Sequence, residues 1–349
     1  MEKYSYFYSI IAVILNQGKM INKNTNNEII RWGILGCGSV TEKKSGPAYQ
    51  KTEGFEVVAV MRRDSDKAAD YATRHGINKY YTDADALIND LEIDAIYIAT
   101  PPDTHKYYGL KVAEAGKICC IEKPLAPSYQ DCMAIYEAFY EKDLPLFVAY
   151  YRRSLPRFKQ IEAWLDDNKI GEVRHISWHL SKPATPQDLE KTYNWRTDVT
   201  IATAGYFDDL ASHGLDLFVH LLGDVKEAKG ISLNQQGLYS SKDAVTACWQ
   251  HESGITGTGS WNFGCSTRED AVEIFGSKGK ITFSVFNEEP VVLSNEQGRT
   301  TLFIENPENI QLCHVEQIRE QLLGNSIHPS NGCSATHTAW IIDKIVENI

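Results

Sequence analysis

The chain has 349 residues, of which 43% are hydrophobic and 23% charged, a composition typical of a soluble globular protein and not of a disordered or fibrous one. Its length favours two domains. The formal net charge is -11, and the basic residues form no run longer than pairs such as Arg62-Arg63 and Arg152-Arg153. A phosphate-binding surface needs a basic stripe, so no nucleic-acid partner is expected.

The eight cysteines include no C-x-x-C pair. In a chain of this size such a pattern indicates reduced, mostly buried thiols and a cytoplasmic location. The apolar run 4–15 is similar to the core of a signal peptide, but Glu2 removes the basic leader and 16–19 offers no small-residue cleavage site. The run is also too short to span a bilayer. We therefore expect residues 1–28 to be an N-terminal extension, disordered or a non-native start, and no membrane partner.

From residue 29 to 149 short apolar runs alternate with helical patterns, as a βαβ series requires. The expected strands are 30–35, 57–60, 93–99, 118–121 and 146–149, and the expected helices are 67–75, 83–90, 104–115 and 128–141, with Ser128 as an N-cap. This half predicts a Rossmann domain, a doubly wound parallel sheet in an α/β fold.

The pattern changes after Tyr150. A helix over 158–168, a strand over 172–180 and a helix over 206–222 are followed by strands joined at the short turns 250–255, 276–279 and 295–298. We expect residues 150–349 to form an α+β domain with a large, mainly antiparallel sheet. The last helices, 310–323 and 334–347, are candidates to pack back on the first domain.

The first expected strand runs into a glycine-rich turn. Gly36 and Gly38 match two glycines of G-x-G-x-x-G, and Thr41 stands at the third. Two glycines still permit a tight turn and close backbone approach to a pyrophosphate. The alternative is a plain structural turn, but the βαβ context favours dinucleotide binding. The predicted contacts in the turn are Gly36, Cys37, Gly38, Ser39 and Val40.

Cofactor choice depends on the end of the second strand, where an acid binds a ribose 2′-hydroxyl and an arginine accepts a 2′-phosphate. Arg62 and Arg63 follow this strand, so NADP(H) is favoured. The alternative is that both arginines are solvated and Asp64 binds the hydroxyls of NAD(H).

Two further strand ends carry candidate residues. Thr100-Pro101-Pro102 and His105 follow the strand 93–99, where prolines would stiffen one wall of a crevice. Glu122-Lys123-Pro124 closes the strand 118–121. Because ligands of an open parallel sheet bind at the carboxyl ends of its strands, Lys123 is the first catalytic candidate. The predicted cofactor contacts at these strand ends are Thr100, Pro101, His105, Glu122 and Lys123 itself.

Asp209, His213, Asp216 and His220 share one face of the expected helix 206–222. A polar helix face with a satisfied histidine is the plain alternative. A zinc site is a third interpretation, but the spacing lacks the H-E-x-x-H pattern, so no metal site is predicted.

Taken in order, the glycine-rich turn, Thr100-Pro101-Pro102, Glu122-Lys123-Pro124 and Asp209-x-x-x-His213 resemble the glucose-fructose oxidoreductase / inositol dehydrogenase (Gfo/Idh/MocA) family. The likeness runs from about residue 29 to the C-terminus and is closest to the sugar-reductase and dihydrodiol-dehydrogenase-like branch. It implies a second domain that binds substrate and forms a homodimer or homotetramer through its sheet. It further implies catalytic Lys123, His213 and Asp209, with Trp195 and Arg196 covering nicotinamide and substrate.

Hydride transfer between a carbinol carbon and a nicotinamide also requires a proton transfer at the oxygen. His213 could act as general acid/base, and Lys123 could polarise the carbonyl; the sequence leaves open which of them carries the proton. Tyr151, Arg152, Trp195 and Tyr206 are candidate sugar contacts. We predict an NADP(H)-dependent oxidoreductase acting on a sugar, sugar derivative or cyclic diol. The alternative is a non-catalytic NADP-binding sensor on the same fold.

Overall fold

The computed structural model describes residues 29–347. The predicted extension 1–28 lies outside these residues. Within them no helix combines the length and the apolar character needed to cross a membrane. By its internal contacts the chain separates into two compact units. The first unit contains 29–122, 134–151 and 307–332, and the second contains 123–133, 152–306 and 333–347.

The first unit is built on a six-stranded parallel sheet with strand order β3-β2-β1-β4-β5-β6. Its strands are β1 (Ile30–Leu35), β2 (Phe55–Met61), β3 (Lys79–Tyr81), β4 (Ala95–Ile98), β5 (Ile118–Ile121) and β6 (Leu146–Val148). The order reverses between β1 and β4, which is the topological switch point where open α/β sheets bind their ligands. The predicted Rossmann sheet is confirmed.

The helices of this unit are α2 (Ser39–Lys43), α3 (Gly46–Lys51), α4 (Ser65–His75), α5 (Ala84–Ile88), η1 (Pro102–Thr104), α6 (His105–Glu114), α11 (Leu312–Leu322) and most of α7 (Tyr129–Glu141), whose residues 129–133 belong to the second unit. Local signals explain several starts. The Asp64 carboxylate accepts the N–H of Lys67 at the N-cap of α4, and the Ser128 hydroxyl accepts the N–H of Asp131 ahead of α7. The predicted N-cap at Ser128 is confirmed.

Three short elements, α2, α3 and β3, were not expected from the sequence. The helices α2 and α3 have five and six residues, too few for a helical period to stand out. Their region is held by tertiary contacts: Tyr49 of α3 is buried in an aromatic cluster with Trp32, Phe55 and Tyr97. One side of α11 adds Val315, Ile318 and Leu322 to the same core.

Backbone hydrogen bonds align the carboxyl ends of the central strands. The N–H of Gly36 donates to Met61 at the end of β2, and the N–H of Ala99 donates to Leu35 at the end of β1. The N–H of Glu122 donates to Ile98 in β4. The glycine-rich turn and the segments after β2, β4 and β5 therefore share one edge of the sheet.

The second unit is built on an eight-stranded sheet with order β14-β13-β12-β11-β7-β10-β9-β8. Its strands are β7 (Val173–Ser181), β8 (Val225–Leu233), β9 (Ala244–His251), β10 (Thr256–Asn262), β11 (Glu269–Gly276), β12 (Gly279–Phe283), β13 (Val291–Asn295) and β14 (Gly298–Leu302). All neighbours pair antiparallel except β7 and β10. The predicted antiparallel sheet and its three turns are confirmed.

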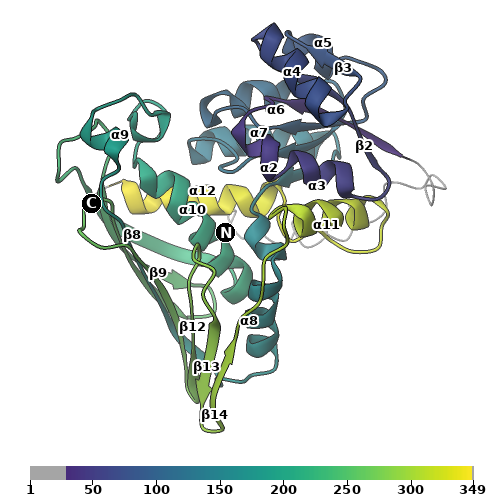
Figure 1. The fold of residues 1–349 in the computed structure, drawn as a ribbon. Coiled ribbons are helices and arrows are strands. Elements are labelled where there is room, and N and C mark those ends of the chain that lie inside the picture. Colours follow the sequence, from purple (N-terminus) through teal and green to yellow (C-terminus); the bar gives the residue numbers. More distant parts are fainter. Residues whose placement is uncertain (1–28, 348–349) are drawn as a thin grey trace. The chain divides into compact units, whose positions relative to one another are not determined.

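The remaining elements are η2 (Tyr151–Ser154), α8 (Pro156–Asp166), α9 (Pro186–Leu189), η3 (Trp195–Thr197), α10 (Tyr206–Leu222) and α12 (Gly332–Val346). Figure 1 shows α10 and α12 on the same side of the large sheet. Gly214 of α10 packs so closely on the Trp178 ring that a Cβ would come within 2.3 Å of it, and a Cβ on Gly230 of β8 would meet Ile345 of α12. This close packing sets the position of α10, which carries Asp209 and His213.

Candidate functional site

The glycine-rich turn uses its two glycines in different ways. Gly36 has φ of +99°, and a Cβ there would lie 2.9 Å from backbone atoms of Ala99 and Thr100. Gly36 is therefore required by the turn itself. A Cβ on Gly38 would meet no atom within 4 Å. The open space over Gly38 fits a group that must approach the backbone closely, as the pyrophosphate of a dinucleotide does.

Thr41, which stands at the third glycine position, is fully buried in this turn. Its hydroxyl donates to the carbonyl of Gly38 at 2.8 Å, and the Tyr71 hydroxyl donates to the carbonyl of Thr41 at 2.9 Å. The Thr41 hydroxyl therefore closes the turn onto Gly38, the backbone carbonyl of Thr41 links the turn to α4, and the open side of Gly38 stays unobstructed. Of the other predicted contacts in the turn, Ser39 is exposed and Val40 half-buried.

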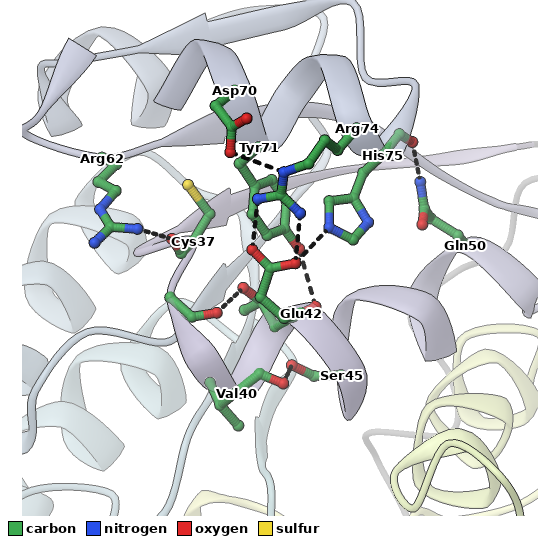
Figure 2. A network of polar contacts seen from close by, with 12 residues as sticks. Cys37, Val40, Glu42, Ser45, Gln50, Arg62, Asp70, Tyr71, Arg74 and His75 are labelled. Atoms are coloured by element: carbon green, nitrogen blue, oxygen red, sulfur yellow. Dashed lines mark hydrogen bonds and ion pairs between the residues drawn. The ribbon is translucent and has the colours of Figure 1, made fainter. Parts of the chain in front are cut away.

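Arg62 reaches from the end of β2 to the glycine-rich turn. Its Nη1 donates to the carbonyl of Cys37 at 3.1 Å (Figure 2). The Cys37 thiol itself is buried, which raises its pKa. Arg63 is exposed, whereas the Asp64 carboxylate is engaged by the N–H and the ammonium of Lys67. A guanidinium, and not a carboxylate, is thus the group bonded to this turn.

A charged cluster that the sequence did not predict braces the turn from α4. Glu42 accepts from Arg74 at 2.7 Å and lies 2.9 Å from Nε2 of His75 (Figure 2). Arg74 also pairs with Asp70 one turn earlier in α4. The hydrogen bond from Arg74, with that from His75, lowers the pKa of Glu42 to about 2. The i, i+4 spacing of Asp70 and Arg74 was the only signal of this cluster in the sequence.

The segment after β4 is stabilised by hydrogen bonds among its own residues. The fully buried His105 ring bonds through Nε2 to the carbonyl of Thr100 at 2.9 Å. Thr104 Oγ1 lies 2.7 Å from the Thr100 hydroxyl oxygen and 2.7 Å from the carbonyl oxygen of Pro101. Thr100 is half-buried and Pro101 exposed at the sheet edge. His105 supports the backbone here, and its role as a cofactor contact stays a prediction.

Glu122 ends β5 with a buried side chain. Its Oε1 accepts from the Tyr97 hydroxyl at 2.5 Å and from Gln311 Nε2 at 2.7 Å. Gln311 precedes α11, so the C-terminal part of the first unit contributes a side chain to this edge of the parallel sheet. Glu122 is the residue before Lys123, and its bonds therefore fix the backbone from which Lys123 extends.

In the second unit, Lys123 and Asp209 form an ion pair with Nζ–Oδ1 of 2.5 Å, and their side chains are 12% and 14% exposed. Lys123 also donates to the carbonyl of Asp209 at 2.8 Å. Arg196 donates to the other carboxylate oxygen, Oδ2, at 2.8 Å. Burial alone would raise the pKa of Asp209, but the charges of Lys123 and Arg196 outweigh it and hold the pKa well below its ordinary value. Asp209 is therefore a carboxylate that keeps two cations in place.

One turn along α10, His213 is 5% exposed, and its Nδ1 lies 2.8 Å from Nη1 of Arg152. An arginine has only donors, so Nδ1 must accept, and the ring proton is assigned to Nε2. Arg152 is itself positioned by a bond from Nε to the carbonyl of Val285 at 3.0 Å and by stacking on the Phe286 ring. The predicted sugar contact Arg152 is thus a direct partner of His213.

The other two polar residues of this helix face have separate partners. Asp216 forms a buried two-pronged ion pair with Arg153, with both N–O distances 2.7 Å. His220 lies 3.2 Å from Glu162 of α8. In the described range no three His, Cys, Asp or Glu side chains gather as a metal site would require. Within residues 29–347 the four groups of this face therefore share no partner and form no common site.

The predicted residues Trp195 and Tyr206 also lie in the second unit near Asp209. The guanidinium of Arg196 stacks on the Trp195 ring at 4.2 Å. The Tyr206 hydroxyl donates to Asp188 at 2.8 Å and accepts from Asn194, and burial raises its pKa to about 12. Tyr151 belongs to the first unit and is 8% exposed.

Lys182 is a residue of this region that the sequence did not single out. Its ammonium lies 3.4 Å from the centre of the Tyr206 ring. A lone lysine at the end of a strand has no spacing or motif that would mark it, so only the folded structure identifies it.

Comparison with known proteins defines the class. Residues 30–150 match an oxidoreductase family with an NAD-binding Rossmann fold, and 158–282 match the GFO/IDH/MocA C-terminal domain. Oxidoreductase P35 of Formosa agariphila is 37% identical over 313 residues, 89% of this chain and 96% of that protein. 1,5-Anhydro-D-fructose reductase of Ensifer adhaerens is 28% identical, covering 78% and 82%. The structure of a levoglucosan dehydrogenase complex with NADH has a TM-score of 0.83 at 22% identity, covering 91% and 96%.

The chain belongs to the Gfo/Idh/MocA family. It is an NAD(P)-dependent oxidoreductase acting on CH–OH groups, with the NAD-binding Rossmann fold of that family.

Proposed function

We propose that this protein is an NADP(H)-dependent oxidoreductase that interconverts a carbinol and a carbonyl carbon of a sugar, sugar derivative or cyclic diol. The observation that carries the proposal is the largely buried ion pair of Lys123 and Asp209, which the part-exposed Arg196 joins, with His213 one helical turn away. A cation kept charged in a dehydrated site can stabilise an oxygen on which negative charge develops.

When bound, a nicotinamide would accept or supply the hydride. The protein must also move a proton to or from the substrate oxygen, and Lys123 and His213 have different roles in this step. His213, with Nδ1 accepting from Arg152, presents its N–H at Nε2 as a hydrogen-bond donor. A general base at Nε2 would need the opposite tautomer. We therefore assign proton transfer at the substrate oxygen to Nζ of Lys123 and orientation of that oxygen to His213.

Asp209 has a supporting role in this scheme. Its carboxylate holds Lys123 through Oδ1 and Arg196 through Oδ2, so both cations keep a fixed direction. Preorganised charges of this kind need no rearrangement during the reaction. Trp195, stacked on Arg196, would then contribute an apolar surface next to the same group.

The preference for NADP(H) over NAD(H) is supported by Arg62 at the end of β2. Its guanidinium is bonded to the glycine-rich turn, and Asp64 is occupied at the N-cap of α4. An arginine at this place accepts a ribose 2′-phosphate, and a free carboxylate would bind the 2′-hydroxyl of NAD(H). Arg62→Ala is expected to raise the Kd of NADPH roughly tenfold or more, equivalent to at least about 1.4 kcal/mol, and to leave the Kd of NADH nearly unchanged.

Domain roles and location are part of the proposal. We assign 29–149 to cofactor binding and 150–349 to substrate binding and self-association. A cytoplasmic location is supported by the eight cysteines, all of which are free thiols.

The decisive experiment follows nicotinamide absorbance with NADPH and NADH, in both directions, over aldoses, ketoses, inositols and diols. Lys123→Met should lower kcat by roughly 10²- to 10⁴-fold, the usual contribution of a general acid/base, and leave the Kd of NADPH unchanged. Near-normal kcat in Lys123→Met would refute the assigned role. Tight NADPH binding with no turnover of any compound would instead favour a sensor.

A further inference from the structure

Lys182 has an unusual environment for a lysine. It follows β7, and its N–H donates to the carbonyl of Asn262 at 3.0 Å, which continues the pairing of β7 with β10. Its ammonium lies over the Tyr206 ring at 3.4 Å and 5.5 Å from the centre of the Phe263 ring. This burial lowers the pKa of Lys182 to about 8. Over the described range 29–347, its Nζ makes no hydrogen bond or ion pair.

The two nearest carboxylates already have donors of their own. Asp188 accepts from the Tyr206 hydroxyl, the Thr185 hydroxyl and the Thr185 N–H. Asp209 accepts from Lys123 and Arg196 on its two oxygens. Both carboxylates act on Lys182 only through their charge. A partly dehydrated ammonium without an acceptor is costly, and a ligand that supplies an acceptor would remove this cost.

Positive charge is in excess around Lys182. Its facing charged groups come from four places: Asp209 in α10, Asp188 in α9, Arg196 in η3 and the exposed Arg268 ahead of β11. With Lys123, which is bonded to Asp209, the cations outnumber the carboxylates. A neutral substrate would leave that excess uncompensated, whereas a singly charged anion would reduce it.

We propose that Lys182 binds substrate and that the substrate is an acidic sugar whose carboxylate pairs with its ammonium. This inference rests on the proposed function, since it assigns the substrate class of the same group of residues. A carboxylate matches a single ammonium as a point charge, so the acid group is the part of the sugar that Lys182 would bind. Lys123 and His213 remain for the reacting oxygen.

The test uses matched pairs of substrates, glucose with glucuronate and galactose with galacturonate, with the corresponding sugar phosphates as a third arm. The wild-type protein should give a kcat/KM for the acid at least tenfold above that for the neutral sugar and above that for the phosphate. Lys182→Met should raise KM for the acid by roughly 10- to 100-fold, the range for a hydrogen bond to a charged group. The KM of the neutral sugar and the Kd of NADPH should stay unchanged.

Two controls sharpen this result. Lys182→Arg keeps the cation and should retain most of the preference for the acid, and Lys226→Met, an exposed lysine of β8, should behave as wild type. Because only protonated Lys182 attracts the anion, KM for the acid should rise as pH increases through about 8. In Lys182→Arg this rise should be absent.

The possible failures are distinguishable. Three results would overturn the inference and leave the proposed function standing. The neutral sugars could turn over as well as the acids, the phosphates could be preferred, or Lys182→Met could lose activity equally for both substrates. Binding of glucuronate to NADPH-loaded Lys123→Met protein, measured by calorimetry, gives a readout without turnover. Absence of both binding and turnover would overturn the inference and the proposed function together.

Discussion

At the scale of single residues, charge placement determines which groups are available for chemistry. Asp209 could have been the acid/base group of a polar helix face, but its two oxygens are bound to Lys123 and Arg196. His213 could have been the base, but its Nδ1 accepts from Arg152. In the function we propose, both residues therefore hold and orient other groups, and Lys123 is the group that exchanges a proton.

The tautomer of His213 is testable directly. In wild-type protein labelled with ¹⁵N-histidine, the His213 signals, identified by their loss in His213→Gln, should show a neutral ring with the proton on Nε2. Arg152→Met removes the donor at Nδ1, so the ring should become a mixture of tautomers and protonate more readily. We expect kcat/KM to fall roughly tenfold, within the range for one charge-assisted hydrogen bond. A proton on Nδ1 in the wild-type spectrum would contradict this assignment.

At the scale of elements, the strand ends and α10 set the geometry of the site. The glycine-rich turn is closed by Gly36, and the side that a dinucleotide would approach is open at Gly38. The helix α10 presents a polar residue on each successive turn, and Asp209, His213 and Asp216 are each bonded to basic residues that the others do not contact. Such a helix can shift only if several buried charges lose their partners together.

The two glycines allow a paired prediction. Gly36→Ala should destabilise the fold by about 1–3 kcal/mol, because it combines a positive φ with a clash against the backbone of Ala99 and Thr100. Gly38→Ala should leave the Tm unchanged, because its Cβ has space, and should raise the Kd of NADPH roughly tenfold. Thermal unfolding and fluorescence titration measure the two effects. Equal NADPH affinity in Gly38→Ala and wild type would count against cofactor binding at this turn.

The buried pair of Arg153 and Asp216 fixes α10 from the side of η2. Arg153→Met should lower the free energy of unfolding by about 3–5 kcal/mol, since it leaves the fully buried Asp216 carboxylate without its cation. The double variant Arg153→Met/Asp216→Leu should recover much of this loss, because replacing both charges by apolar groups is often neutral. Denaturant titrations of the two variants provide the comparison. If the free energy of unfolding of the single variant falls by less than about 1 kcal/mol, Thr338, which also bonds to Asp216, is sufficient to stabilise the Asp216 carboxylate.

At the scale of the whole molecule, the large sheet has one covered and one open face. The open face carries Lys229, Ile231, Cys248 and Glu273 around a groove of about 730 Å³. Ile231 and the neighbouring Leu233 on β8 are 65% and 50% exposed. Exposed apolar side chains grouped on a flat surface are typical of an interaction site, and we propose that this face forms the homodimer or homotetramer.

Self-association through this face has a simple test. Wild-type protein should show the mass of a dimer or tetramer by light scattering, and Ile231→Asp should shift it toward the monomer, because a carboxylate would have to be buried in the contact. Ile327→Asp is a matched control, since Ile327 is 57% exposed in the first unit. An unchanged mass in Ile231→Asp would place any contact elsewhere.

Much of this molecule could be predicted from its sequence because the relevant signals are local. The strands 30–35 and 118–121 and the helix 206–222 have the predicted bounds, since a short apolar run or a helical period over many residues dominates its own surroundings. The strand-end candidates Gly36, Arg62 and Lys123 followed from chain order alone. The short helices α2 and α3 did not, because tertiary packing of Tyr49 and Thr41 holds them.

The sequence by itself determined the class of the fold, the family and the residues at the strand ends, because periodicity, glycine turns and motif order are properties of neighbouring positions. Only the tertiary structure decided which partners those residues have. The partners that restrict His213 and Asp209, and the ammonium of Lys182 over Tyr206, come from segments tens of residues apart. Charge and tautomer depend on the distances between such segments, and distances of this kind exist only after the chain has folded.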